Sequence, residues 1–370
     1  MATRSRKRSD DAPPPSPDRI EGAPHPAETR VLHGQHRAER AFLDAWARGR
    51  LAHGWLLCGP EGIGKATLAY RIARATIAST TPLPSLDVPP DCPVAARIRG
   101  GAEPRLRVLR RALDDKTGKL RTRIAVEDMR AVKGFLQFSV PDGGWRVVIV
   151  DAADEMNANA ANAMLKFLEE PPPATLILLV AHAVGALLPT IRSRCRLLDL
   201  RPLGADDLGA ALSAAGQQVD NPAALAALSG GSAGRAVRLL SEDGLALYER
   251  LVGLLGERLD RPALVGLAAV SASAEGRAKL ALIADLSALL LARLARAAAT
   301  GTPPPGALPA EQALAARVAA RPEQAEPWAE AATRLTAAAA AAQAVNLDPG
   351  QTILDMWLDL DATLARAAAV

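Results

Sequence analysis

Aromatic side chains are scarce in this chain of 370 residues, which contains 5 Trp, 2 Tyr and 4 Phe. Proteins that hold single-stranded nucleic acid by stacking need aromatic rings on which successive bases lie. The shortage therefore argues against a base-stacking platform. Alanine is abundant instead, and because alanine is the strongest helix former, the composition favours helices.

Cysteine is rarer still, and the three cysteines, Cys58, Cys92 and Cys195, are far apart in the sequence. No C-x-x-C pair occurs and no histidine stands at metal-ligand spacing, so we expect neither a disulfide framework nor a zinc site. Three isolated thiols fit a reducing compartment.

A long uninterrupted apolar run is also missing. The charged start, MATRSRKRSDD, has no apolar segment behind it and does not resemble a secretory signal. The most apolar stretch, 174–191, contains His182, Gly185 and Pro189, which indicates a buried strand followed by a loop. We therefore expect a soluble cytoplasmic protein without a membrane span.

The net charge is only +4, but the basic residues are unevenly distributed. Residues 97–133 contain twelve Lys or Arg against five Asp or Glu. Such a segment is able to contact nucleic-acid phosphates, and a solvated basic face without a partner explains the pattern equally well.

A glycine-rich motif lies between a short apolar run and a helical pattern. Trp55-Leu-Leu-Cys leads into GPEGIGK, and this order of strand, glycine-rich turn and helix is the context of a phosphate-binding loop. The backbone N–H groups and the helix N-terminus would hold phosphate, and the lysine would reach its terminal oxygens. The predicted nucleotide-binding residues are Gly59, Gly62, Gly64, Lys65, Ala66, Thr67 and, at the end of a later strand, Asp151.

Two positions of this site depart from the pattern of a hydrolysing enzyme. Ala66 stands where a Ser or Thr hydroxyl would hold Mg²⁺, and Ala152 stands where a second acid would orient water. Binding of ATP or ADP therefore remains open, whereas efficient hydrolysis is not expected. If the chain does hydrolyse ATP, Thr67 would serve as metal ligand and Asp154 or Glu155 as base.

Strands and helices alternate between 30 and 202, which predicts an α/β domain with a parallel P-loop sheet. Residues 1–29 are expected to be a disordered tail, 203–243 a small helical lid, and 244–370 an all-α collar that mediates oligomerisation. Within the α/β domain we expect strands at 55–58, 106–109, 145–151, 176–180 and 197–200, helices at 68–77, 126–136 and 157–170, a polar turn at 114–119 and a long loop at 79–104.

Three segments together resemble one family. GPEGIGKAT, VVIVDAADEMNANAANAMLKFLEEPP and LLPTIRSRC occur in this order, and they resemble the clamp-loader branch of the AAA+ family over residues 31–202. By itself the Ser-Arg-Cys triplet is a weak signal and fits a surface arginine that pairs with an acid. The resemblance implies instead that Arg194 is an arginine finger that acts in trans on ATP bound by a neighbouring subunit. It also implies a hetero-pentamer with gamma/tau and delta clamp-loader subunits, which acts on a sliding clamp and primed DNA.

The same resemblance raises three smaller points. His182 occupies the place of the family's polar sensor and is either a substitute sensor or an ordinary loop histidine. In GGSAGR, either Gly234 or Arg235 matches a second sensor arginine. Many members carry a four-cysteine zinc module near 80–105, and because this chain has only Cys92 there, no zinc is expected. An ATP-hydrolysing gamma/tau-like clamp-loader subunit, another AAA+ ATPase and a general DNA-binding protein remain alternatives.

Overall fold

A computed structural model describes residues 19–114, 119–137, 144–255, 259–271 and 276–368. The chain divides into two units, the first made of residues 1–203, 210–217 and 232–234 and the second of the remainder. The predicted disordered tail, 1–29, lies outside the described residues up to residue 18, as does the centre of the predicted turn, 115–118. The end of that tail is ordered, because Ala27 is 4% exposed and packs in the core of the first unit. The separate lid and collar boundaries remain predictions.

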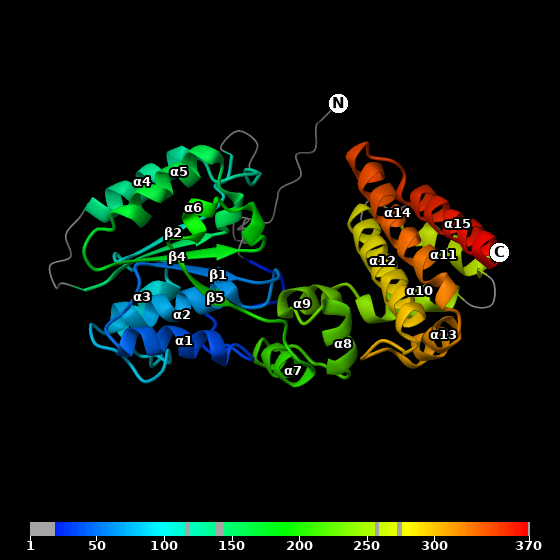
Figure 1. Cartoon of the computed structure of the whole chain (residues 1–370), viewed down its shortest axis with the longest axis horizontal. Helices are drawn as coiled ribbons and strands as arrows, with labels where there is room; N and C mark the ends of the chain where they lie inside the picture. The colour runs from blue at the N-terminus through cyan, green and yellow to red at the C-terminus, as the bar shows by residue number, and fades with distance from the viewer. Residues whose placement is uncertain (1–18, 115–118, 138–143, 256–258, 272–275, 369–370) are drawn as a thin grey trace, which may run out of the picture. The chain divides into compact units, whose positions relative to one another are not determined.

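The first unit contains a five-stranded parallel sheet in the order β2-β3-β4-β1-β5 (Figure 1). The inner strands are runs of Val, Ile and Leu that are buried on both faces, as expected for a parallel sheet covered by helices. The strands are β1 (Gly54–Cys58), β2 (Leu106–Leu109), β3 (Arg146–Asp151), β4 (Thr175–Ala181) and β5 (Arg196–Asp199). This confirms the predicted α/β class.

Helices cover both faces of the sheet (Figure 1). On one face Phe42 and Leu68 pack with Leu57 of β1, and on the other Val132 and Met164 pack on the alternate strand residues. Helices on the first face are α1 (His36–Ala47), α2 (Lys65–Ala78) and α3 (Pro93–Arg99), and those on the second are α4 (Val126–Gln137), α5 (Ala158–Glu169) and α6 (Pro189–Arg192).

The prediction of a continuous loop over 79–104 is wrong in its second half, because α3 lies there. Pro93 occupies the first turn of this helix, where its missing N–H costs nothing. Val94 and Ile98 are buried one turn apart and join the core. Seven residues are too few for a helical period to be recognised in a proline-rich stretch.

The rest of the described chain is helical, as predicted. Between the sheet and residue 243 lie α7 (Ala205–Ala214), α8 (Pro222–Ser229) and α9 (Ala233–Ser241). Residues 244–368 form α10 (Gly244–Leu254), α11 (Arg261–Ser271), α12 (Gly276–Thr300), α13 (Pro309–Ala319), α14 (Ala325–Ala344) and α15 (Pro349–Ala368). None of the helices among the described residues is long and apolar enough to cross a membrane.

A buried ion pair joins two helices of the second unit. Arg293 of α12 places Nε 2.6 Å and Nη2 3.2 Å from the two carboxylate oxygens of Glu311 on α13. Glu311 is 0% exposed and Arg293 is 8% exposed. Tyr248 of α10 is also fully buried, and its pKa is raised by burial and by the Glu311 charge. The pair therefore fixes how these helices pack.

Candidate functional site

The phosphate loop has the conformation that its sequence predicts. Gly59, Gly62 and Gly64 have φ angles of 140°, 75° and 102°, which other residues rarely adopt. Lys65 begins α2 and is 3% exposed. Its Nζ donates hydrogen bonds to the carbonyl oxygens of Gly59 (2.7 Å) and Pro60 (2.6 Å). The lysine is thus held inside the loop that it completes.

The hydrogen bonds of this loop show what it is able to bind. The four carbonyl groups of residues 59–62 all accept hydrogen bonds from donors of this chain. Within the described chain, no hydrogen bond joins the backbone N–H of Gly62, Gly64 or Lys65 to a protein acceptor. A loop whose acceptors are occupied while its N–H groups are open is suited to an anion. The residues present therefore fit a nucleotide phosphate, although Ala66 offers no hydroxyl to a metal ion.

The charge of Lys65 is strongly affected by its surroundings. Burial lowers the pKa of its amine from 10.5 to about 8, and the carboxylates of Asp151, Asp154 and Glu61 oppose this decrease. Asp151 is the last residue of β3, two strands away from β1 in the sheet. The structure thus brings the predicted strand-end carboxylate into the electrostatic environment of the loop lysine.

This shifted pKa predicts a pH dependence of stability. Between about pH 8 and 10.5 the unfolded chain binds more protons at Lys65 than the folded chain, so the free energy of unfolding rises with pH across that interval. Urea denaturation at about pH 7 and about pH 10 measures this effect. Between these two pH values, the free energy of unfolding of wild type should rise relative to that of Lys65→Met, which lacks the titrating amine. Parallel pH profiles for the two proteins would contradict the shift.

A short segment after α8 packs on the outside of the phosphate loop, within the first unit. Ser232 Oγ donates to the Glu61 carbonyl (2.8 Å), and the Gly234 N–H donates to the Gly62 carbonyl (2.9 Å). A Cβ on Gly62 would lie 2.5 Å from Ser232 Oγ and 3.1 Å from Gly234 Cα. Gly62 is therefore required both by its φ angle and by the close approach of this segment.

Replacement of Gly62 by alanine is expected to destabilise the chain more than the same change at Gly49. Both glycines have positive φ, 75° and 65°, but nothing lies within 4 Å of a Cβ on Gly49. The φ strain of about 1 kcal/mol is common to both variants, whereas Gly62→Ala adds an overpacking cost of about 1–3 kcal/mol. Chemical denaturation measures the difference, and equal losses of stability would show that the segment at Ser232 yields without cost.

Buried Gln35 ties the loop to the edge of the sheet. Its side chain exchanges two hydrogen bonds with the backbone of Arg201, at 2.7 and 3.1 Å, and its Nε2 also lies 3.5 Å from the Ile63 carbonyl. Gln35 is 3% exposed. The sequence gives no role for Gln35, because a lone Gln carries no signal of a partner 166 residues away.

Asp154 and Glu155, the two predicted alternative bases, each contact other groups of this chain. Asp154 accepts hydrogen bonds from the backbone N–H groups of His182 (3.2 Å) and Ala183 (2.9 Å), so it fixes the turn after β4. Glu155 lies 2.8 Å from Arg111 Nε. Burial raises the pKa of Glu155, and Arg111 opposes this. Asp154 therefore helps to fix the turn after β4 and Glu155 is paired with Arg111, so both carboxylates have structural contacts beside the phosphate loop.

His182 lies on the turn that Asp154 holds. Burial lowers the pKa of its imidazole, and the nearby Lys65 charge lowers it further, while Asp154 and Glu61 raise it. The ring is therefore close enough to the loop lysine to respond to its charge. Whether His182 acts as a sensor stays a prediction.

Arg194 lies on a different part of the first unit, beyond α6. Its Nη2 is 2.9 Å from Glu169 Oε1 at the end of α5, and its Nη1 donates to the Thr190 carbonyl (3.0 Å). The side chain is 37% exposed. Among the described residues, the contacts of Arg194 are with Glu169, Thr190 and Ser193 and not with the chain's own phosphate loop.

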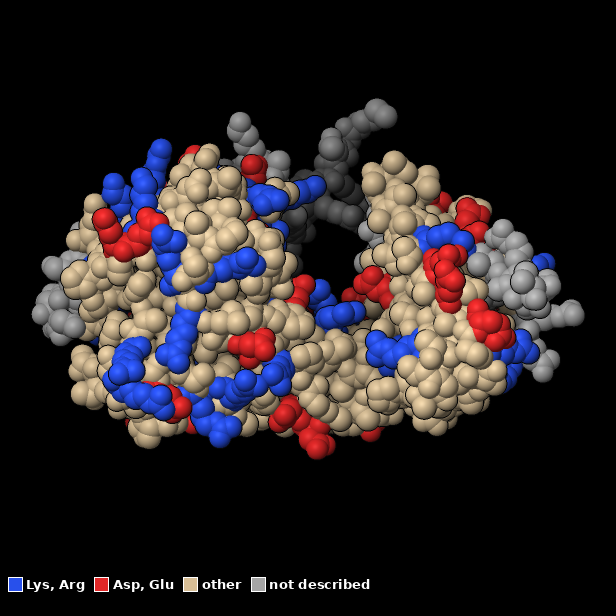
Figure 2. Space-filling model, in the orientation of Figure 1, with Lys and Arg blue, Asp and Glu red and all other residues tan. Residues whose placement is uncertain are grey.

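Many Lys and Arg side chains of the basic segment lie at the surface. Figure 2 shows basic side chains over much of the visible face of the α/β unit. Arg97 and Arg105 pair with buried Glu103, and Arg111 pairs with Glu155, so part of the excess is structural. The exposed members among the described residues include Arg99, Arg107, Lys119, Arg123, Arg130 and Lys133.

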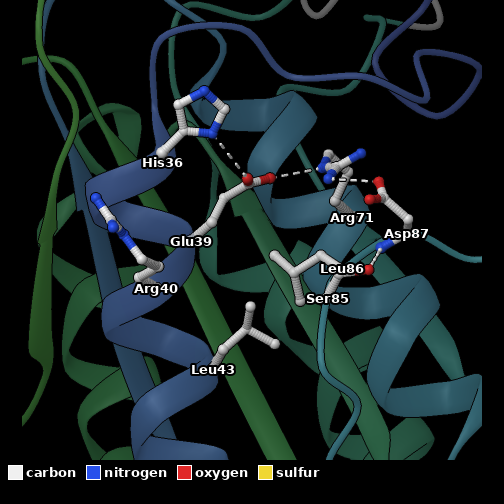
Figure 3. Close-up of a pocket in the computed structure, with 8 residues that line it drawn as sticks. All are labelled: His36, Glu39, Arg40, Leu43, Arg71, Ser85, Leu86 and Asp87. Carbon is white, nitrogen blue, oxygen red and sulfur yellow. Dashed lines mark hydrogen bonds and ion pairs between the residues drawn. The ribbon is translucent and has the colours of Figure 1, made fainter.

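A pocket of about 340 Å³ opens between α1, α2 and the loop before α3 (Figure 3). At its wall Arg71 pairs with Glu39 (2.8 Å) and with Asp87 of the loop (2.9 Å). Both carboxylates are thus occupied by the nearly buried arginine. The pocket shows how the 79–92 loop is anchored, and it does not suggest a ligand.

No cluster of three or more His, Cys, Asp or Glu side chains suited to a metal ion occurs in the part of the chain that the structure describes. The three cysteines are free. Sequence reasoning missed Ser232 and Glu169, whose partners lie far away in the sequence. Glu169 stands within LEEPP, which was noted as a family signature and not as a contact of Arg194.

Comparison with known proteins finds a matching family model and several similar proteins. Residues 34–204 match the family model described as "DNA polymerase III, delta subunit". The chain is 39% identical over 148 residues to "DNA polymerase III subunit delta'" of Pseudomonas aeruginosa, covering 40% of this chain and 43% of the relative. It is 32% identical over 158 residues to the Bacillus subtilis protein of the same name, covering 42% and 44%.

A further relative is "DNA polymerase III subunit gamma" of Buchnera aphidicola, 28% identical over 171 residues and covering 46% of this chain and 44% of the relative. The chain thus spans less than half the length of each of these curated relatives. The family-model match covers the sheet domain, including the phosphate loop and Arg194. Over residues 34–204 this chain is therefore similar to the DNA polymerase III delta-subunit family, and two of the three relatives are delta-prime subunits.

Proposed function

We propose that this chain is the delta-prime subunit of a bacterial DNA polymerase III clamp loader and donates Arg194 in trans to a neighbouring ATPase subunit. One contrast supports this most strongly. Arg194 stands exposed on an ordered segment, whereas the chain's own site has Ala66 and Ala152 at the catalytic positions. Asp154, the nearest substitute acid, is bound to the turn after β4.

The chemistry of ATP hydrolysis explains why such a division of labour works. Water attacks the γ-phosphorus, the bond to the β–γ bridging oxygen breaks, and ADP and inorganic phosphate are released. Charge on the transferring phosphoryl group is stabilised by a guanidinium supplied from outside the site. A chain that supplies Arg194 therefore contributes to turnover without hydrolysing nucleotide itself.

Under this proposal the partners are gamma/tau and delta subunits in a hetero-pentamer, which opens a sliding clamp and places it on primed DNA. ATP or ADP bound in the loop around Lys65 would stabilise this chain without being hydrolysed. Arg130 and Lys133 lie exposed one turn apart on α4, and such side chains are suited to contacts with DNA phosphates in the assembly.

Reconstitution tests the proposal. Gamma/tau, delta, clamp and primed DNA are combined with or without this chain, and clamp loading is followed by a fluorescent clamp. We expect stable assembly and loading only when the chain is present. An assembly that forms and loads clamps equally well without it would overturn the proposed role.

The alternative is an ATP-hydrolysing gamma/tau-like subunit. The Ala66→Ser/Ala152→Glu variant tests it, because it restores the missing hydroxyl and the missing acid. If the native site is silenced, the purified variant should gain ATPase activity that wild type lacks. Equal ATPase activity of both proteins, well above background, would favour the alternative.

A further inference from the structure

The backbone that carries Arg194 is fixed from several sides. Ile191 of α6 is fully buried in the core of the second sheet face. A Cβ on Gly54, at the start of β1, would lie 3.3 Å from both the Arg194 carbonyl oxygen and Cys195 Sγ. Burial raises the pKa of the Cys195 thiol to about 12, as expected for a packed side chain. Strand pairing resumes at once, with Arg196 opposite Trp55.

The end of α5 meets the same place. A Cβ on Gly54 would also lie 2.9 Å from Leu168 Cδ2, and the preceding His53 ring is hydrogen-bonded through Nε2 to the Leu168 carbonyl (2.9 Å). Glu169, the last residue of α5, therefore projects from a helix end that is fastened to β1. The Glu169 carboxylate lies at the end of α5 and Arg194 lies before β5, and both segments pack against the start of β1.

The guanidinium itself has three contacts, of which the one with Ser193 Oγ is the longest at 3.5 Å. Glu169 Oε1 lies 2.9 Å from Nη2, and the Thr190 carbonyl accepts a hydrogen bond from Nη1. An arginine has five N–H donors, so these contacts leave donors for a phosphate. The exposed fractions are 37% for Arg194 and 48% for Glu169, and the pair is therefore open on one side.

We propose that Glu169 is a positioning residue, which holds the Arg194 guanidinium in the orientation needed to reach ATP on the adjacent subunit. This inference rests on the proposed function. A free arginine side chain samples many rotamers, and ordering it during the reaction would slow turnover. Glu169 and Thr190 order it beforehand, at a site whose backbone is already fixed.

The opposite possibility is a latch, in which Glu169 withholds the arginine from phosphate. An exposed ion pair is weak, so it would not compete with a triphosphate and its metal ion. Furthermore, a latch should use most of the guanidinium donors, whereas here Glu169 contacts a single nitrogen. The geometry therefore favours positioning.

The test uses the reconstituted clamp loader with primed DNA and clamp, in which this chain carries Glu169→Ala, Glu169→Gln or the matched control Glu170→Ala. Glu170 is the exposed neighbour that caps α5. We expect Glu169→Ala to lower kcat of the site that depends on Arg194 by about threefold to tenfold, with KM for ATP unchanged. Glu169→Gln, which keeps an oxygen acceptor, should recover most of that loss, and Glu170→Ala should behave as wild type.

Combination with Arg194→Ala separates the two proposals. If Glu169 acts through Arg194, adding Glu169→Ala to Arg194→Ala causes no further loss. A normal or raised kcat for Glu169→Ala, beside a lowered kcat for Arg194→Ala, would overturn the positioning role and leave the finger intact. If Arg194→Ala itself has no effect, the proposed function fails.

Discussion

Arg194→Ala in this chain is expected to slow ATP hydrolysis at the adjacent site of the assembled clamp loader by about 1,000-fold or more. Removal of an arginine finger costs this much because the guanidinium stabilises charge that develops on the transferring phosphoryl group. Under the proposed function, the other ATPase sites of the assembly do not depend on Arg194. Single-turnover hydrolysis should therefore lose one rapid phase and retain the rest.

Arg192→Ala is the matched control for this experiment. Arg192 ends α6, is exposed, and lies two residues from Arg194, so both variants remove one positive charge from the same surface. A general electrostatic role would make the two losses similar. We expect Arg192→Ala to keep the rapid phase, and gel filtration should show that both variants assemble as wild type does.

Glu311→Ala is expected to lower the free energy of unfolding of the second unit by about 3–5 kcal/mol. The substitution leaves the Arg293 charge in a nearly buried place without its carboxylate, which is the costly way to break an ion pair. The Pro305 carbonyl, which accepts from Arg293 Nη2 at 3.2 Å, cannot neutralise that charge. Urea denaturation followed by circular dichroism measures the loss.

The double variant Arg293→Met/Glu311→Leu is the control, because it removes both charges and keeps most of the buried volume. Replacement of a whole buried pair by apolar side chains is often close to neutral. We expect it to recover most of the stability that Glu311→Ala loses. If the single variant is as stable as wild type, the pair does not hold α12 and α13 together.

The sequence predicted the sheet well because its signals are local. The run from Val147 to Val150 has no helical period, and GPEGIGK stands between strand and helix. Such patterns depend on neighbours in the chain, so no knowledge of the tertiary structure was needed. The positions of Lys65, Asp151 and the last strand followed in the same way.

The sequence could not show which groups the polar side chains of the candidate site contact. The Asp154 carboxylate accepts hydrogen bonds from the turn at His182, 28 residues away, and nothing in the local sequence indicates this contact. Likewise, Glu169 and Ser232 carry no local mark of the partners they bind. Side-chain hydrogen bonds across the fold depend on tertiary placement, so the sequence could propose candidate site residues but could not show which groups they contact.

ATP hydrolysis by the purified chain alone, measured beside the complete assembly on primed DNA with clamp, tests the central claim most directly. We expect no turnover above background from the lone chain, and rapid turnover from the assembly that contains it. Hydrolysis by the lone chain at a rate comparable to that of the assembly would contradict the claim that it serves as a partner and not as a motor.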